Sequence, residues 1–170
     1  MADKRIRVIA AFAGVGKSAF AERNPEKFTD FALMPYKYYL DPDREFDESG
    51  KANPENVMRE DWPRNYAEAI QRALAESDKT LIIPSDSSVL RLLREKDIPY
   101  LLVYPAREAK EVYRKRFIAR GNTEDFLSVF IDGWDRFMDS LENDQYGDHR
   151  VLRPEQYLSD AISADRSYYR

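Results

Sequence analysis

IRVIAAFAGVGKSAF, residues 6–20, is the stretch that decides the fold. Its first part, 6–11, is a short apolar run with the character of a buried strand. Two glycines follow, and a Lys-Ser pair then opens a short helix over 17–23. A strand, a glycine-containing loop and a helix in this order are typical of a loop that binds phosphate groups through its backbone.

The loop matches the pattern G-x-x-x-x-G-K-[ST] at Gly16, Lys17 and Ser18, while Ala11 replaces the first glycine. An incidental strand-to-helix turn is the alternative, but it leaves the coincidence of strand, loop, Lys-Ser pair and helix unexplained. We expect Lys17 to bridge the β- and γ-phosphates of a nucleoside triphosphate and the Ser18 hydroxyl to bind Mg²⁺. The residues expected to contact the bound nucleotide are Ala13, Gly14, Val15, Gly16, Lys17, Ser18 and Ala19.

The rest of the chain alternates between apolar runs and helical periods, which predicts an α/β protein with a mainly parallel sheet. With 170 residues, 43% of them hydrophobic and 34% charged, the chain is expected to form one domain, 1–170. Strands are expected at 6–11, 27–31, 80–84, 98–105 and 149–154. Helices are expected at 17–23, 65–76, 87–97, 106–120 and 124–141, with a last one from about residue 154, at a proline that suits a first helical turn.

Composition excludes several classes of function. Lys and Arg number 27 against 31 Asp and Glu, so the net charge of −4 gives no overall basic field for nucleic acid. The chain has no cysteine and one histidine, His149, which excludes zinc-thiolate sites and a cysteine nucleophile. No apolar run approaches the roughly 20 residues that span a bilayer. We therefore expect a cytoplasmic protein with no membrane partner.

Two acidic residues are candidates for the chemistry. Asp86 follows a buried-type strand, where an acid can hold Mg²⁺, although it also suits the N-cap of the next helix. Asp30 ends the second strand, where an acid can accept the proton of an acceptor hydroxyl or orient the acceptor. The alternative for Asp30 is a surface charge on an edge strand.

Two arginines fall within the apolar stripe of the expected helix 106–120. Arg116 and Arg120 lie one turn apart beside Gly121, rather than on the charged side of that helix. An arginine in such a place either pairs with an acid or meets an anion. Because phosphoryl transfer concentrates negative charge, the two arginines are candidates for stabilising the transferred group.

Residues 34–64 form a long polar stretch with four prolines and little periodicity, which is typical of a functional segment. Its aromatic and cationic side chains could sandwich a base and hold an acceptor phosphate. Anchoring of an irregular segment to the core is the alternative for each of them. The candidates for acceptor binding are Tyr36, Arg59, Trp62 and Arg64.

The order of these parts resembles the nucleoside monophosphate kinase-like (adenylate kinase-like) branch of the P-loop kinases. The resemblance rests on AFAGVGKS, a short strand, a variable insertion (34–64), TLIIPSD, YLLVYP and the arginine-bearing VYRKRFIARGN. The chain also resembles small phage and bacterial ATP-binding, kinase-like proteins through DWPRNYAEAI, LVYP and RGN. It departs from the branch at Ala11, in lacking an aspartate-arginine pair after the second strand, and in a short lid without zinc cysteines.

The resemblance implies a three-layer P-loop NTPase fold whose five-stranded parallel sheet has the strand of the phosphate loop at its centre. It implies MgATP as the donor, 34–64 as an acceptor-binding insertion, and 106–123 as a lid-type segment whose arginines close over the transferred phosphate.

Three functions remain open at this point. The first is ATP-dependent phosphoryl transfer to a small nucleotide, a nucleoside or deoxynucleoside monophosphate. The second is a kinase for a hydroxyl of a nucleoside, a nucleic-acid end or a modified base, although the acidic balance counts against a polynucleotide. The third is a noncatalytic ATP-binding module that senses nucleotide or docks a partner, with core packing as the alternative for its candidate face. The residues of that face are Phe130, Trp134, Phe137, Met138 and Leu141.

Overall fold

A computed structural model describes residues 5–39 and 57–163 of the chain and contains a single five-stranded, all-parallel sheet. The strand order is β2-β3-β1-β4-β5, so the strand before the phosphate loop lies at the centre, as expected. The strands are β1 (Val8–Ala11), β2 (Phe28–Asp30), β3 (Thr80–Pro84), β4 (Leu101–Pro105) and β5 (Asp148–Leu152). The predicted fold class is confirmed.

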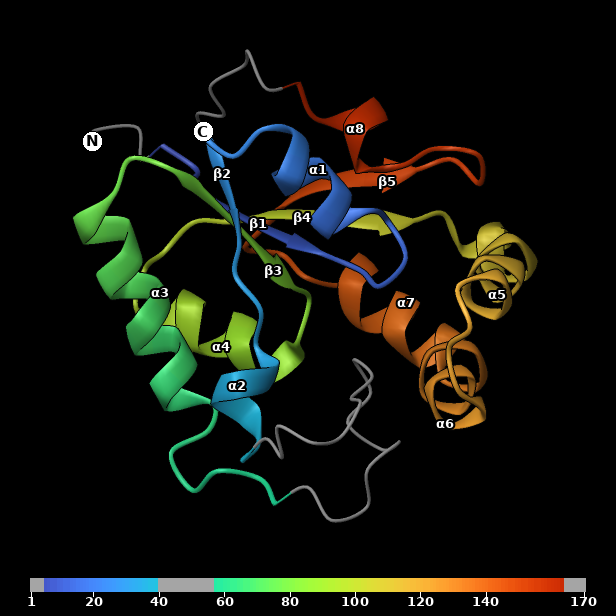
Figure 1. Ribbon diagram of the computed structural model, residues 1–170, viewed down its shortest axis with the longest axis horizontal. Coiled ribbons are helices and arrows are strands. Elements are labelled where there is room, and N and C mark those ends of the chain that lie inside the picture. The colour runs from blue at the N-terminus through green and yellow to red at the C-terminus, as the bar shows by residue number, and fades with distance from the viewer. Residues whose placement is uncertain (1–4, 40–56, 164–170) are drawn as a thin grey trace.

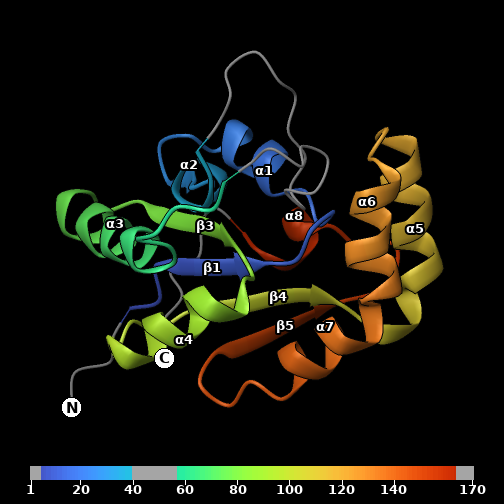
Figure 2. The ribbon, with the colours of Figure 1, turned by 90° about the horizontal axis from the view of Figure 1, so that it is seen from below.

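Helices cover both faces of this sheet and form the outer two of three layers (Figures 1 and 2). One face carries α1 (Lys17–Arg23) and the short α8 (Leu158–Ala161), and the other carries α3 (Arg64–Glu76), α4 (Ser87–Glu95) and α7 (Trp134–Glu142). The helices α5 (Lys110–Ala119) and α6 (Glu124–Leu127) stand side by side beyond the carboxyl end of β4 (Figure 2). The single turn α2 (Met34–Lys37) follows β2.

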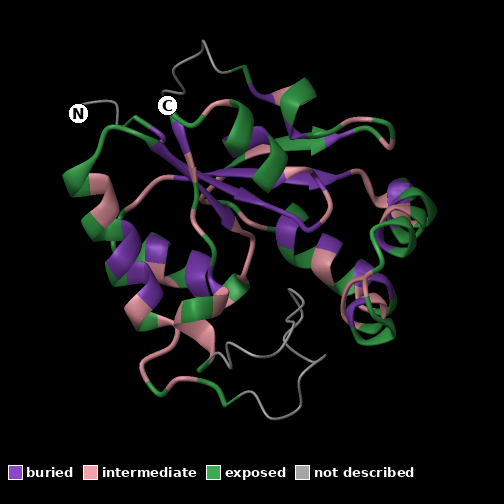
Figure 3. Cartoon of the chain, in the orientation of Figure 1, coloured by how far each residue is buried: buried purple, intermediate pink, exposed green. Residues whose placement is uncertain are grey.

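The central strands are buried on both faces, which is why they are almost wholly apolar (Figure 3). All four residues of β1 are buried, and β1 pairs with β3 on one side and β4 on the other. The connection after β1 leads to β2 at one edge of the sheet, whereas the connection after β3 crosses β1 to reach β4. The carboxyl ends of β1 and β3 therefore form a topological switch point, where ligands of α/β proteins bind. The phosphate loop begins at this point.

Several boundaries differ from the expected ones. The helix expected at 124–141 is three pieces, because a π-helical turn (Ser128–Asp132) and Gly133 separate α6 from α7. The helix expected at 106–120 starts with a 3₁₀ turn (Arg107–Ala109) before α5. The last helix begins at Leu158 and not near residue 154, since residues 154–157 form a turn and an extended piece against the phosphate loop.

The stretch 34–64 contains more order than its sequence indicates. Its described residues, 34–39 and 57–64, contain α2 and an antiparallel bridge between Tyr38 and Met58. The part of this expected insertion from 40 to 56 lies outside the described residues.

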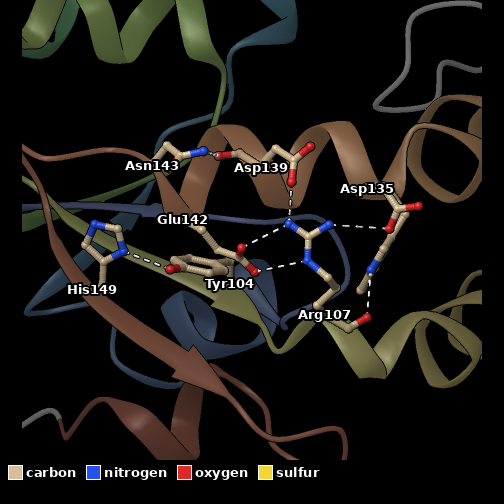
Figure 4. Close-up of polar contacts among 8 residues, drawn as sticks. Tyr104, Arg107, Asp135, Asp139, Glu142, Asn143 and His149 are labelled. Carbon is tan, nitrogen blue, oxygen red and sulfur yellow. Dashed lines mark hydrogen bonds and ion pairs between the residues drawn. The ribbon is translucent and has the colours of Figure 1, made fainter.

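Salt bridges fasten the start of the expected lid segment to α7. Arg107 pairs with Asp135, Asp139 and Glu142, while its carbonyl oxygen accepts a hydrogen bond from Trp134 Nε1 at 2.9 Å (Figure 4). The Tyr104 hydroxyl lies 2.8 Å from His149 Nδ1 across the β4–β5 pair. The base of this segment is therefore tied to the body of the domain.

Candidate active site

The phosphate loop has the backbone that its glycines predict. Gly14 and Gly16 have positive φ angles of 80° and 92°, a region that side chains disfavour. Lys17 is only 8% exposed, and its Nζ donates to the carbonyl oxygen of Phe12 at 3.3 Å. A buried ammonium group beside the N-terminus of α1 is a strong attractor for an anion, because little water screens it.

Ser18 and Asp30 meet directly although they belong to different elements. The Ser18 hydroxyl donates to Asp30 Oδ2 at 2.6 Å, because α1 packs beside β2 and Asp30 is the last residue of that strand. Hydroxyl and carboxylate oxygens are the hard ligands that Mg²⁺ prefers. The donor set therefore fits the expected Mg²⁺, with Ser18 as ligand, and the bending of the loop around Gly14 and Gly16 fits the phosphates of ATP.

Asp86 acts as a helix cap in this structure. Its carboxylate accepts hydrogen bonds from the backbone N–H groups of Ser88 and Val89 at the start of α4, and it lies 3.7 Å from Lys37 Nζ. It nevertheless lies at the carboxyl end of β3, in the same cavity as Lys17 and Ser18. Its role as a second Mg²⁺-binding group stays a prediction.

Arg116 and Arg120 differ from each other, although both lie beside the phosphate loop. The Arg116 guanidinium donates to the carbonyl oxygens of Gly14, Pro154 and Gln156 at 3.4, 2.9 and 3.3 Å. It also stacks on Tyr157, 3.9 Å from the ring centre. Arg120 is exposed, and no hydrogen bond or ion pair joins its side chain to another residue within the described ranges. The lid role of both arginines stays a prediction.

Two hollows meet at the phosphate loop. The first, which we call the loop groove, has a volume of about 440 Å³ and lies between the loop, α5 and Tyr157. Its lining residues are Gly14, Gly16, Lys17, Ser18, Ala19, Arg116, Ala119, Arg120 and Tyr157.

The second hollow, which we call the aromatic cavity, has a volume of about 240 Å³ and lies between the loop, the end of β2 and the π-helical turn. One part of its lining comes from the end of β2, the α2 segment and the residues after β3. These lining residues are Asp30, Leu33, Met34, Lys37 and Asp86. Its apolar wall from the loop, the π-helical turn and α7 consists of Phe12, Val129, Phe130 and Phe137. Lys17 and Ser18 line both hollows, so a group held by these two side chains is accessible from either one.

The four acceptor-binding candidates of the 34–64 stretch lie outside the lining of both hollows. Tyr36 stacks on Phe31, and Trp62 packs against Tyr66, whose burial raises the pKa of its phenol well above the usual range. Arg59 pairs with Asp61 at 3.2 Å, and Arg64 lies 3.9 Å from Glu68 on an exposed surface of α3. Their role in acceptor binding stays a prediction.

Sequence reasoning missed other residues of the site. It assigned Phe130 and Phe137 to core packing or a partner face, and it singled out neither Lys37 nor Tyr157. The only signal for the two phenylalanines is their spacing of seven residues, which also marks a buried face. Long-range packing, which no local spacing encodes, places them in the cavity.

Two features are absent from the described residues, 5–39 and 57–163. In those ranges no three His, Cys, Asp or Glu side chains gather as a metal-binding group. Nor does any helix in the same ranges have the length and apolar character to cross a membrane.

The chain has a kinase-like α/β fold, with five parallel strands in the order β2-β3-β1-β4-β5. The chain is similar to the solved structure of the tunicamycin resistance protein from Deinococcus radiodurans, with a TM-score of 0.52 and 17% sequence identity. The likeness covers 94% of this chain and 90% of that one, and at this identity it shows the fold alone. No family model matches the sequence. A search of curated proteins also found no match.

Proposed function

We propose that the protein is an MgATP-dependent kinase that transfers the γ-phosphoryl group to a hydroxyl of a small acceptor. One observation carries this proposal: Lys17 and Ser18 line both the loop groove and the aromatic cavity. A donor phosphate held by these residues from the groove side would face an acceptor in the cavity. Phosphoryl transfer needs this in-line placement more than it needs covalent chemistry from the protein.

The chain's own groups would hold the donor through charge and hydrogen bonds. The loop N–H groups would bind the phosphate oxygens, and the buried Lys17 ammonium would neutralise charge on the β- and γ-phosphates. Mg²⁺ supplies charge stabilisation at the transferring group when bound, and Ser18 would be its protein ligand. Arg120, exposed on the groove side, would add positive charge at the transferred group.

We propose Asp30 as the base for an acceptor hydroxyl. Its Oδ2 accepts the hydrogen bond from Ser18, and it lines the aromatic cavity beside the donor residues. In the proposed step Asp30 takes the proton of the acceptor hydroxyl as the acceptor oxygen bonds to the γ-phosphorus. The bond from the γ-phosphorus to the β–γ bridging oxygen breaks, and ADP leaves.

A hydroxyl acceptor is better supported than the nucleoside monophosphate that ranks first from sequence. A phosphate acceptor calls for a cationic clamp, usually of arginines. The described lining of the aromatic cavity contains no arginine, and its Lys37 lies 3.7 Å from Asp86. Arg59 and Arg64 pair with acids elsewhere.

The test is transfer from labelled MgATP to a panel of nucleosides, nucleoside monophosphates and short oligonucleotides. We expect label on a hydroxyl-bearing acceptor, and we expect Lys17→Ala to abolish transfer while the circular dichroism spectrum stays unchanged. Asp30→Asn should lower kcat by about 10²–10⁴-fold, the usual contribution of a general base. The Mg²⁺ concentration for half-maximal rate should stay the same, which separates a base from a metal ligand.

Glu22→Gln is the matched control, because Glu22 is an exposed acid on α1 outside both hollows. Full transfer by Lys17→Ala would contradict the proposed donor site. Tight ATP binding without transfer to any acceptor would instead favour the noncatalytic module.

A further inference from the structure

We propose that the aromatic cavity selects an uncharged nucleoside, with its base stacked on the Phe130–Phe137 pair and its sugar hydroxyl directed to Asp30. This inference rests on the proposed kinase function and names its acceptor. It assigns the choice of acceptor to two phenylalanines of the π-helical turn and α7, which follow the expected lid segment in the chain.

The two rings form a rigid platform. Phe130 and Phe137 stack with ring centres 5.4 Å apart and planes 15° from parallel. The buried Phe12 meets both rings edge-on, at 5.7 Å from each. Phe130 and Phe137 are only half-buried, and both line the cavity. Rings that are fixed before binding offer a planar ligand a surface with little loss of conformational freedom.

The backbone deviates from a regular helix where it supplies this platform. The π-helical turn (Ser128–Asp132) contributes Val129 and Phe130 to the cavity, while Trp134 and Met138 of α7 are fully buried. A Cβ at Gly133 would lie 2.4 Å from the Val129 carbonyl oxygen, so glycine permits the close approach at the end of this turn. Single π-helical turns within helices are frequent at functional sites.

The charges of the cavity disfavour a phosphorylated acceptor. Besides the donor-binding Lys17, its described lining contains the carboxylates of Asp30 and Asp86 and one ammonium group, that of Lys37. Lys37 lies 3.7 Å from Asp86, so Asp30 remains as the uncompensated charge on the acceptor side. A dianionic phosphate would be repelled there, whereas a neutral hydroxyl can donate its hydrogen bond to Asp30.

The size of the cavity favours one small molecule. Its volume is about 240 Å³, below the range of about 300–1,000 Å³ typical of sites for drug-sized ligands. A base with its sugar is a ligand of this scale, and a segment of oligonucleotide is not. A stacking platform, a hydroxyl acceptor and the absence of a phosphate clamp from the described lining together point to a nucleoside.

Calorimetric titration of the full chain, loaded with Mg²⁺ and a nonhydrolysable ATP analogue, tests the inference. The probes are adenosine, guanosine, cytidine and thymidine, each against its own 5′-monophosphate. We expect at least one nucleoside to bind ten-fold or more tightly than its monophosphate. Phe130→Leu should weaken binding of that nucleoside at least ten-fold.

Tyr146→Leu is the matched control, since Tyr146 is a half-buried aromatic residue outside the cavity lining. Monophosphates that bind as tightly as nucleosides, or no nucleoside binding, would overturn the inference, and this comparison needs no variant. Unchanged nucleoside affinity in a folded Phe130→Leu protein would overturn it as well. A failure of the proposed kinase function would give a different result. No label would be transferred from ATP, although nucleosides would still bind more tightly than their monophosphates.

Discussion

At the residue scale, Gly14 bears two constraints at once. Its φ of +80° lies in the region that L-residues disfavour, and an added Cβ would come 2.7 Å from Cε1 of Phe117. Gly121, at the end of α5, has a similar φ of +78° but nothing within 4 Å of the same position. Substitutions at Gly121 therefore report backbone strain alone, whereas substitutions at Gly14 also report the close approach of α5 to the phosphate loop.

We expect Gly121→Ala to lower the free energy of unfolding by about 1–2 kcal/mol, the cost of a left-handed alanine. Gly14→Ala should lower the free energy of unfolding by about 1–3 kcal/mol more than Gly121→Ala does, because the Phe117 ring must move in a packed core. Gly14→Ala should also weaken ATP binding, which Gly121→Ala should leave unchanged. Urea unfolding with an unchanged m value, together with ATP titration, measures both effects. Equal losses of stability in the two variants would contradict the assigned contact.

At the element scale, α5 is attached to the phosphate loop and to the C-terminal turn through Arg116. Its guanidinium donates to carbonyl oxygens of both, and the Leu158 N–H donates to the Val15 carbonyl oxygen at 2.8 Å beside it. Burial of the neighbouring Tyr113 raises the pKa of its phenol to about 12, although the nearby Arg116 charge opposes this shift. Arg120 lies one turn further along the chain and takes no part in this connection.

We expect Arg116→Ala to lower the free energy of unfolding by about 1–3 kcal/mol, because half-buried carbonyl oxygens lose their donors. Its KM for ATP should rise, since the loop loses its connection to the C-terminal turn. Arg120→Ala should change stability by less than about 0.5 kcal/mol, as exposed substitutions do, and lower kcat instead. Steady-state kinetics and thermal unfolding of both variants measure the contrast. An unchanged kcat in Arg120→Ala would remove its proposed role at the transferred group.

At the scale of the whole molecule, one aspartate joins several parts of the chain. The side chain of Asp144 is 4% exposed and accepts hydrogen bonds from Tyr100, Arg94 and the backbone of Tyr146 and Gly147. Burial alone would raise the pKa of this carboxyl. The Gly147 N–H and the Tyr100 hydroxyl, with the Tyr146 N–H and the Arg94 charge, outweigh burial, so the pKa lies below its usual range.

A lowered carboxyl pKa makes the folded state sensitive to acid. Asp144 contributes its full stabilisation above the ordinary aspartate pKa of about 3.9, and this is lost as the pH falls through the lower pKa of the folded state. We expect Asp144→Ala to lower the free energy of unfolding by about 1–3 kcal/mol at pH 7, because the buried Tyr100 hydroxyl loses its acceptor. The deficit relative to wild type should shrink as the pH drops below about 4. Unfolding curves from pH 7 to pH 2 measure this, with the exposed Asp78→Ala as control.

The phosphate loop and most elements follow from local sequence, whereas the central place of β1 in the sheet was implied by the resemblance to P-loop kinases. The apolar run of β1, the glycines and the Lys-Ser pair are neighbours in the chain, so their pattern predicts their geometry, and α1 occupies 17–23 as expected. The break near Gly133 was not predictable, because the helical period of 124–141 continues through the π-helical turn that interrupts it. Helix periodicity reports which residues share a face, and it carries no information about which face a distant element covers.

By itself, the sequence determined the α/β class and the parallel sheet, because apolar runs and helical periods alternate along the chain. It also determined the position of the phosphate loop, because the residues of the loop are neighbours within one strand and one helical turn. Only the tertiary structure decided which side chains meet there. The Ser18–Asp30 hydrogen bond joins two elements, and the Arg116 contact with Gly14 spans 102 residues. The aromatic cavity likewise depends on the packing of Phe12 against Phe130 and Phe137. Contacts across such separations depend on how whole elements pack, and no spacing within a single element specifies them.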